Sequence, residues 1–185
     1  AAYGDKVSLP TSEIHEFNPV SPYGIQKLIG EQYCRVFSEV YNMETACLRY
    51  FNVYGDRMPS RVGGAYRLII PIWAECTLEG RPLTITNDGN QRRDFIHVHD
   101  VVRANWLAMN NTDVIKGEAI NIGSGSNTSI NELAATWGGE TKFIGTRLEP
   151  RETLADISKA KKLLDWEPTV DLKQWIIQYK RTLEL

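Results

Sequence analysis

The run Thr45-Ala46-Cys47-Leu48-Arg49-Tyr50-Phe51-Asn52-Val53 is short and largely apolar, and Tyr54-Gly55-Asp56 bounds it on its far side. A continuous apolar run of this length that ends at a turn signal is typical of a strand buried in a parallel sheet. Upstream, apolar side chains recur at helical spacing over residues 22–41, and Ser21 and Pro22 suit the cap and the first position of a helix. A helix followed by a buried strand favours an α/β protein.

Further short elements alternate along the rest of the chain. The loop from Gly55 to Arg67 is long enough to suggest a function. Apolar spacing and turn residues predict strands over 83–86, 94–98 and 119–122, with a turn at 88–90. They also predict a helix over 68–78 ended by Gly80, and a helix capped by His99 or Asp100 that reaches Met109. The last predicted helices are one capped by Thr128 and two over 157–164 and 172–183. This alternation indicates the α/β class.

Composition narrows the kinds of partner. The 185 residues carry a formal net charge of −2, without the basic excess of a nucleic-acid-binding protein. No apolar run is long enough to span a membrane, and there is no basic-then-apolar leader. Cys34, Cys47 and Cys76 lie far apart in apolar stretches, and the histidines lack the spacing of a zinc site. We therefore expect a cytoplasmic chain with buried free thiols, no metal, no nucleic acid and no membrane.

The start of the first helix, Ser21-Pro22-Tyr23-Gly24-Ile25-Gln26-Lys27, places Tyr23 and Lys27 four residues apart on one helical face. An ammonium beside a phenol favours the phenolate, because a nearby opposite charge stabilises the ionised form. Such a pair can serve as a general acid/base near neutral pH. The same spacing also fits an ordinary surface pair, so the residues alone leave both interpretations open.

A second motif, Gly123-Ser124-Gly125-Ser126, follows a strand and precedes a helix, as the start of a dinucleotide-binding loop does. However, Thr128 stands where the third glycine of Gly-x-Gly-x-x-Gly would be, and no acidic residue closes a second strand at the expected distance. We therefore interpret the motif as a plain turn between a strand and a helix.

Several segments together resemble the extended short-chain dehydrogenases/reductases that act on nucleotide sugars, such as UDP-hexose 4-epimerases and sugar-nucleotide dehydratases. The segments cover nearly the whole chain in the order of the family, and they are Ala2-Tyr3-Gly4-Asp5, Pro22-Tyr23-Gly24-Ile25-Gln26-Lys27, Leu48-Arg49-Tyr50-Phe51-Asn52-Val53-Tyr54-Gly55, Asp88-Gly89-Asn90-Gln91-Arg92-Arg93-Asp94-Phe95-Ile96-His97-Val98, Asn121-Ile122-Gly123-Ser124-Gly125, Ala155-Asp156-Ile157-Ser158-Lys159-Ala160 and Leu163-Leu164-Asp165-Trp166-Glu167-Pro168.

The resemblance implies the C-terminal part of a doubly wound, Rossmann-like parallel sheet and a small α/β substrate-binding domain. Residues 1–60 and 87–125 would belong to the dinucleotide-binding domain, and residues 61–86 and 126–185 to the nucleotide-sugar domain. The Gly-rich phosphate loop, the first strands and the catalytic Ser/Thr of the family all precede the segment that resembles Ala2-Tyr3-Gly4-Asp5. The resemblance therefore covers the C-terminal portion of such an enzyme, and the chain is expected to associate with the missing N-terminal half or to form a homodimer.

The implied activity is NAD-dependent epimerisation of a nucleotide sugar, most naturally of a UDP-hexose, through a transient 4-keto intermediate. In the family the tyrosine is the acid/base and the lysine binds the nicotinamide ribose, so Tyr23 and Lys27 take these roles by resemblance. The wording Arg-Tyr-Phe-Asn-Val-Tyr-Gly over 49–55 favours an epimerase. A 4,6-dehydratase and a non-catalytic fragment that only binds the sugar nucleotide are the alternatives.

Other site residues follow from the resemblance. Tyr50 and Val53 would border the nicotinamide, with ordinary core as the alternative for both, and Asn52 would hydrogen-bond the sugar nucleotide. Arg93 matches the diphosphate-binding arginine, whose planar fork suits phosphate, and Arg92 is interpreted as a solvated side chain. Thr84 or Thr86 would contact uracil, unless they form the exposed half of an alternating strand. Near 147–151 the family shows an arginine, a small residue and an acid that contact phosphate and ribose, so Arg147 is the second expected phosphate ligand.

Overall fold

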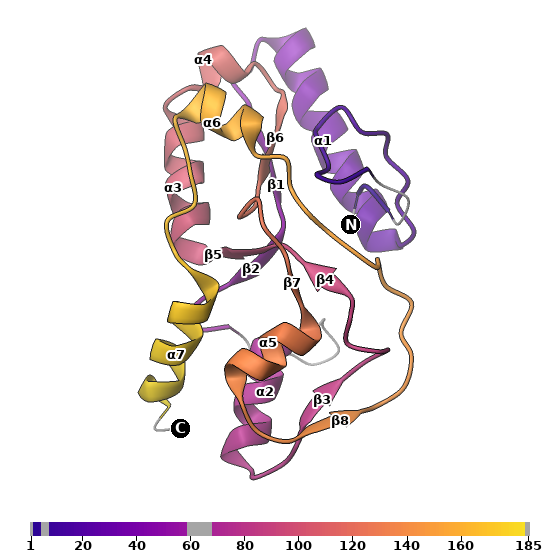
Figure 1. The fold of residues 1–185 in the computed structure, drawn as a ribbon. Coiled ribbons are helices and arrows are strands. Elements are labelled where there is room, and N and C mark those ends of the chain that lie inside the picture. The colour runs from indigo at the N-terminus through magenta and orange to yellow at the C-terminus, as the bar shows by residue number, and fades with distance from the viewer. Residues whose placement is uncertain (1, 5–7, 59–67, 184–185) are drawn as a thin grey trace.

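The structure is a computed structural model that describes residues 2–4, 8–58 and 68–183, and it confirms the α/β class (Figure 1). Its helices are α1 (Pro22–Tyr41), α2 (Ile69–Leu78), α3 (Val98–Met109), α4 (Thr112–Ile115), α5 (Ile130–Trp137), α6 (Ser158–Leu164) and α7 (Leu172–Thr182). Its strands are β1 (Cys47–Tyr50), β2 (Asn52–Tyr54), β3 (Leu83–Ile85), β4 (Arg92–Arg93), β5 (Phe95–His97), β6 (Ala119–Ile122), β7 (Thr128–Ser129) and β8 (Thr141–Phe143).

The strand predicted over 45–53 is interrupted at Phe51, because its two parts bond different partners. β1 pairs in parallel with β6, and β2 pairs in parallel with β5. The Phe51 N–H donates to the Ile122 carbonyl at 3.0 Å, whereas the next N–H, that of Asn52, donates to the Asp94 carbonyl at 3.0 Å. This change of partner brings Asn52 beside the start of β5, which lies far from it in the sequence.

Helix α1 begins and ends where the sequence predicts. The Ser21 hydroxyl accepts a hydrogen bond from the Gly24 N–H at 3.1 Å, Pro22 occupies the first turn, and Asn42 ends the helix in the left-handed conformation with a φ of 53°. Of the α1 residues only Gly24 is buried. The apolar side chains that stay exposed are Tyr23, Ile25, Ile29, Tyr33, Val36, Phe37, Val40 and Tyr41.

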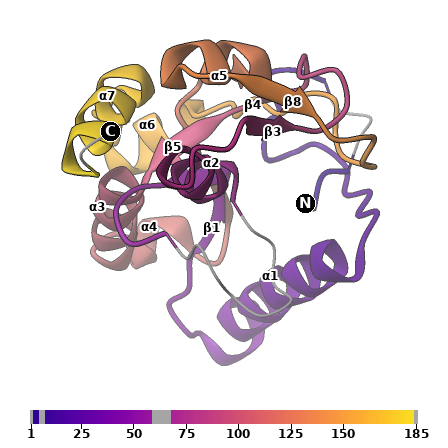
Figure 2. The ribbon, with the colours of Figure 1, turned by 90° about the horizontal axis from the view of Figure 1, so that it is seen from below.

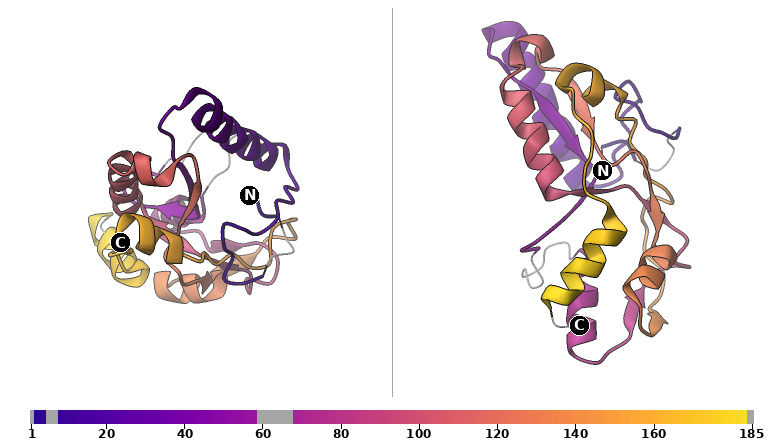
Figure 3. Two further views of the ribbon diagram at one scale, coloured as in Figure 1. Left: turned by 90° about the horizontal axis from the view of Figure 1, so that it is seen from above. Right: turned by 60° about the vertical axis from the view of Figure 1, so that its left-hand side comes forward.

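Two hydrophobic cores organise the rest of the molecule. The helices that form them lie toward opposite ends of the ribbon in the right-hand view of Figure 3. The first joins α2, β3, α5 and α7, with Trp73 and Trp137 at 0% and 1% exposure. The second joins α3, β6 and α6 to Trp166, whose indole N–H donates to the Asp100 carbonyl at 2.9 Å. Helix α6 and Trp166 therefore pack with α3 and β6, although they fall in the sequence range expected for the other domain.

Two helix caps differ from the prediction. Ser129, not Thr128, caps α5, since its hydroxyl accepts from the Glu132 N–H at 3.1 Å and the Glu132 carboxylate accepts from the Ser129 N–H at 2.8 Å. Thr128 is held in β7, opposite Arg93 of β4. His97 caps α3, because its Nδ1 accepts from the His99 N–H at 3.2 Å. Over the described residues, no helix is both long and apolar enough to cross a membrane.

Candidate nucleotide-sugar site

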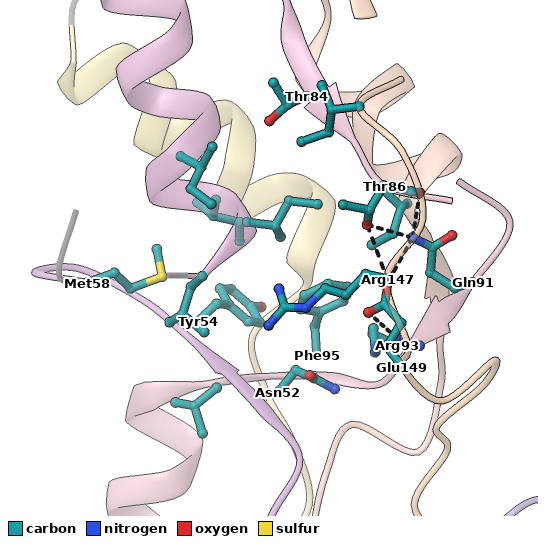
Figure 4. Close-up of a pocket in the computed structure, with 17 residues that line it drawn as sticks. Asn52, Tyr54, Met58, Thr84, Thr86, Gln91, Arg93, Phe95, Arg147 and Glu149 are labelled. Carbon is teal, nitrogen blue, oxygen red and sulfur yellow. Dashed lines mark hydrogen bonds and ion pairs between the residues drawn. The ribbon is translucent and has the colours of Figure 1, made fainter. Parts of the chain in front are cut away.

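A cavity of about 310 Å³ lies between α2, β3 and the segment 144–149 (Figure 4). Its lining is apolar apart from a few converging polar groups, as in small-molecule sites. The apolar lining residues are Val53, Tyr54, Met58, Leu68, Ile69, Ile70, Ile72, Phe95, Ile130 and Ile144, and the polar ones are Asn52, Thr84, Thr86, Gln91, Arg93, Arg147 and Glu149.

An ion pair between Arg93 and Glu149 forms the polar end of the cavity. Arg93 Nη2 lies 2.6 Å from Glu149 Oε2, and Arg93 Nη1 donates to the Arg92 carbonyl at 2.8 Å. The side chains are 10% and 24% exposed, so the pair is largely removed from water. A guanidinium has five N–H donors in a planar fork, and these two bonds leave donors for a phosphate group.

Glu149 also accepts hydrogen bonds from uncharged side chains in the turn after β3. Its Oε1 accepts from the Asn87 amide at 2.9 Å and from the Thr86 hydroxyl at 3.3 Å. The Gln91 amide donates to the Thr86 carbonyl at 3.0 Å and reaches Glu149 Oε1 at 3.4 Å. These bonds hold the Glu149 carboxylate over the polar end of the cavity, as Figure 4 shows.

Of the residues predicted at the strand end, Asn52 and Val53 line the cavity and Tyr50 does not. The Asn52 amide donates to the Asp94 carbonyl at 2.9 Å. Val53 also packs against the second core. Tyr50 is 46% exposed and its hydroxyl donates to Asn105 on α3 at 2.8 Å, so ordinary core is wrong for this residue.

Thr84 and Thr86 both line the cavity and are half-buried, whereas Leu83 and Ile85 are buried, so burial alternates along this strand. The contact of Thr84 or Thr86 with uracil stays a prediction. Arg147 lines the cavity from the opposite segment, and its N–H donates to Asn87 Oδ1 at 2.8 Å. The interpretation of Arg92 as a solvated side chain is also wrong, because its guanidinium is bonded to Asn127 and lies 3.1 Å from Glu132.

Tyr54 lines the cavity as a neutral phenol. Burial raises the pKa of Tyr54, and the nearby carboxylates of Asp100 and Asp171 raise it further. Its hydroxyl donates to the Val170 carbonyl at 3.4 Å. A phenol held in its protonated form does not accept a proton near neutral pH, so Tyr54 shapes the cavity rather than acting as a base.

Tyr23 and Lys27 share a face of α1 as predicted, but they do not line this cavity. The Lys27 ammonium lies 5.1 Å from the centroid of the Tyr23 ring, and Tyr23 is 47% exposed. Figure 2 shows α1 well separated from β3 and β8. Their proposed roles therefore stay predictions.

The Gly123–Ser126 motif does not lead directly into a helix, because β7 intervenes before α5. Its backbone donors are already occupied by a carboxylate of the chain itself. The Ser124 N–H donates to Asp94 Oδ1 at 2.6 Å, and the Gly125 N–H donates to Asp94 Oδ2 at 3.2 Å. The loop thus binds an internal anion and does not fit a dinucleotide phosphate.

Two further findings bear on the site. In the part of the chain that the structure describes, no group of His, Cys, Asp and Glu residues is arranged to hold a metal ion. The three cysteines are free thiols, of which Cys76 is buried and Cys34 and Cys47 are half-buried.

Sequence reasoning did not name Glu149, Gln91 or Asn87 as site residues. Glu149 lies in the 147–151 segment where an acid was expected from the resemblance, so that acid was the available signal. Gln91 and Asn87 carry no chemical signature of their own, and only their contacts with Glu149 mark them.

Comparisons with known proteins agree with the family that the sequence resembles. The family model described as the NAD dependent epimerase/dehydratase family matches residues 1–123. A Methanocaldococcus jannaschii protein whose name proposes it as a UDP-glucose 4-epimerase is 41% identical over 95% of this chain and 57% of its own length. The chain thus spans little more than half the length of that relative.

Two solved structures have the same fold. A variant of the UDP-glucuronic acid 4-epimerase of Bacillus cereus, in complex with UDP-4-deoxy-4-fluoro-glucuronic acid and NAD, matches with a TM-score of 0.88 and 34% identity, over 99% of this chain and 58% of that one. The UDP-glucose 4-epimerase of Thermotoga maritima with UDP-glucose matches with a TM-score of 0.86 and 34% identity, over 99% of this chain and 61% of that one. These matches confirm the Rossmann-like α/β fold class.

Proposed function

The chain belongs to the NAD dependent epimerase/dehydratase family, and we propose that it provides the nucleotide-sugar site of a UDP-hexose 4-epimerase. The observation that carries the proposal is the cavity in which Asn52, Arg93 and Arg147 come together from distant segments. Structures of similar proteins with UDP-sugars bound support the class of ligand.

The charges and hydrogen-bonding groups of the cavity suit a nucleoside diphosphate sugar. Arg93 binds the diphosphate through its remaining donors, with Arg147 as a second cation. Thr84 and Thr86 contact the uracil, and Asn52 hydrogen-bonds the sugar nucleotide. Glu149 accepts hydrogen bonds from ribose hydroxyls while it holds the Arg93 guanidinium in place.

Proton transfer is assigned to Tyr23. Tyr23 takes the proton of the sugar 4-hydroxyl and later returns it, and the Lys27 ammonium lies 5.1 Å from the centroid of the Tyr23 ring, on the same face of α1. NAD, when bound, supplies the hydride acceptor of such a reaction, and Tyr23, Lys27, Tyr50 and Val53 would contact its nicotinamide end. The diphosphate of the substrate stays bound to Arg93 while the 4-keto sugar rotates, so that the hydride returns to the other face of the sugar.

The two hydrophobic cores support a division of the chain into two lobes, which we assign as follows. The core of α3, β6 and α6 belongs to the dinucleotide-binding lobe, and the core of α2, β3, α5 and α7 belongs to the nucleotide-sugar lobe. The exposed apolar side chains of α1 favour association with a second copy or with the N-terminal half of the family fold.

A chain that binds the sugar nucleotide without turnover is the second candidate. Two observations favour it, namely that Tyr23 and Lys27 lie outside the cavity and that Asp94 fills the Gly123–Ser126 loop.

Calorimetric titration with UDP-glucose, and separately with ADP-glucose, which carries a different base, tests the proposed site. We expect saturable binding of the UDP sugar, weakened about 10- to 100-fold by Arg93→Ala because a charge-assisted phosphate contact is lost. Arg81→Ala is the matched control, since Arg81 is exposed and pairs with Glu79. A chain that binds neither sugar nucleotide would contradict the proposal.

Turnover separates the two candidates. Incubation with NAD and UDP-glucose, followed by chromatography of the sugar nucleotides, should yield the 4-epimer if the chain is catalytic. Saturable UDP-sugar binding with no epimer and no bound NAD would assign the chain to the binding-only candidate.

A further inference from the structure

Asp94 is a fully buried carboxylate at 0% exposure, and neither the acid/base proposal nor the substrate contacts use it. Besides the two loop N–H groups, its oxygens accept from the Ser124 hydroxyl at 2.8 Å and from the Ala155 N–H at 3.0 Å. The loop is built around this carboxylate, since a Cβ on Gly123 would lie 2.7 Å from Asp94 Oδ2 and 2.6 Å from the Ala155 Cβ.

The backbone of Asp94 is tied to the cavity wall at the same time. Its carbonyl accepts both the backbone N–H and the side-chain amide of Asn52, at 3.0 and 2.9 Å. Its own N–H donates to the Thr153 hydroxyl at 3.2 Å, and the Asn52 amide also reaches that hydroxyl at 3.4 Å. Asp94 therefore links Asn52 to the 153–155 segment that follows Glu149.

Arg93 is the preceding residue. Successive side chains of an extended strand point to opposite faces, and here the Arg93 side chain faces the cavity while the Asp94 side chain enters the Gly123–Gly125 loop. The anchored carboxylate therefore fixes the piece of backbone from which the Arg93 guanidinium projects.

We propose that Asp94 is a positioning residue for the nucleotide sugar, whose carboxylate occupies the glycine loop and thereby sets the places of Arg93 and Asn52 in the cavity. The inference rests on the proposed function, because it assumes that these two residues bind the ligand. Asp94 itself touches no ligand.

The test compares UDP affinity among buried-aspartate variants of the chain. Asp94→Asn places an amide against N–H donors, and we expect UDP binding to weaken about tenfold or more, because a small displacement of a binding group costs much affinity. Asp100→Asn is the matched control. Asp100 is equally buried and accepts from the Thr169 and Val170 N–H groups at 3.0 and 3.1 Å, but it does not line the cavity. We expect it to lower the melting temperature while UDP affinity changes less than about twofold.

Chemical rescue supplies a readout that general destabilisation would not give. Formate should fill the space left in Asp94→Ala, restore UDP affinity in that variant and leave the unsubstituted chain unaffected. If the aspartate variants do not fold, Ser124→Ala removes one bond to the carboxylate and should weaken UDP binding about threefold.

The outcomes are distinguishable. An unsubstituted chain that fails to bind UDP overturns the proposed function and this inference with it. An unsubstituted chain that binds UDP overturns the inference alone if folded Asp94→Asn, or Ser124→Ala where the aspartate variants do not fold, binds equally well. Equal loss in Asp94→Asn and Asp100→Asn, or no rescue by formate, also overturns it.

Discussion

Arg93 and Glu149 form the charged part of the proposed phosphate site, and their ion pair is present without a ligand. A largely buried guanidinium needs a counter-charge, because removing one partner of such a pair leaves an uncompensated charge. Glu149 lies 2.6 Å from Arg93 and supplies that charge. It also keeps the guanidinium in one orientation, which reduces the side-chain entropy lost when a ligand binds.

The role of Tyr23 gives the first prediction. In a form of the protein that turns over, Tyr23→Phe should lower kcat about 100- to 10,000-fold, because the transferable proton is gone. UDP affinity should stay unchanged, because Tyr23 does not line the cavity. Steady-state kinetics and calorimetry check both statements. Tyr33→Phe, at another exposed tyrosine of α1, is the control, and normal turnover by Tyr23→Phe would contradict the assignment.

His97 gives a prediction for pH. Burial lowers the pKa of His97, and the neighbouring His99 lowers it further, against weaker opposing effects of Asp100 and Asp56. Its Nδ1 must also stay unprotonated to accept from the His99 N–H. In the unfolded chain the histidine has its ordinary pKa of about 6.5 and binds the proton more readily. The stability of the fold therefore decreases as the pH drops through that pKa.

Thermal unfolding is measured at about pH 7.5 and about pH 5.5, on either side of the ordinary histidine pKa. The melting temperature should be lower at the acidic pH, and the difference should shrink in His97→Asn, which keeps a short acceptor without a titrating ring. An unchanged pH dependence in His97→Asn would remove His97 as the cause.

At the scale of elements, short strands and caps hold the site together. β4 pairs with β7, and β7 leads directly into α5, so Arg93 and the N-terminus of α5 are fixed relative to each other. The capping box of Ser129 and Glu132 satisfies N–H groups that would otherwise lack partners at this helix end.

Substitution of the cap tests this arrangement. Ser129→Ala should lower the free energy of unfolding by about 1 kcal/mol, because the Glu132 N–H loses its acceptor. Thr128→Ala should cost less, since Thr128 does not cap α5. Urea denaturation measures both variants, and a larger effect at Thr128 would contradict the observed cap.

Across the whole molecule, α1 stands out as a helix with many exposed apolar side chains. Val40 and Tyr41 are 66% and 67% exposed, and the other exposed apolar residues of the helix lie between 41% and 62%. Each large apolar side chain left in water forgoes about 1.5–3 kcal/mol of burial. An apolar surface of this kind marks an interaction site.

We therefore expect the chain to self-associate through α1. Light scattering coupled to size-exclusion chromatography should show a species larger than a monomer at micromolar concentration. Val40→Glu should shift the population toward monomer, whereas Gln26→Glu on the same helix should not. A strictly monomeric chain at all concentrations would contradict self-association.

Much of the fold followed from local chemistry in the sequence. Ser21, Pro22 and Asn42 define both ends of α1 through bonds within a few residues, and β6 occupies the predicted range over 119–122. Likewise, the family pattern in the sequence around Asn52, Arg93 and Thr86 predicted three residues that line the cavity, and their binding roles stay predictions.

Features that depend on distant partners could not be predicted from the sequence. Whether Phe51 interrupts a strand depends on β5 and β6, and whether Gly123–Ser126 can hold a phosphate depends on Asp94. The contact of Glu149 with Arg93 is made by folding, across a separation of 56 residues. Capping and helix periodicity are local and can be inferred from the sequence, whereas the partner that satisfies a buried charge or strand edge is chosen by packing in three dimensions.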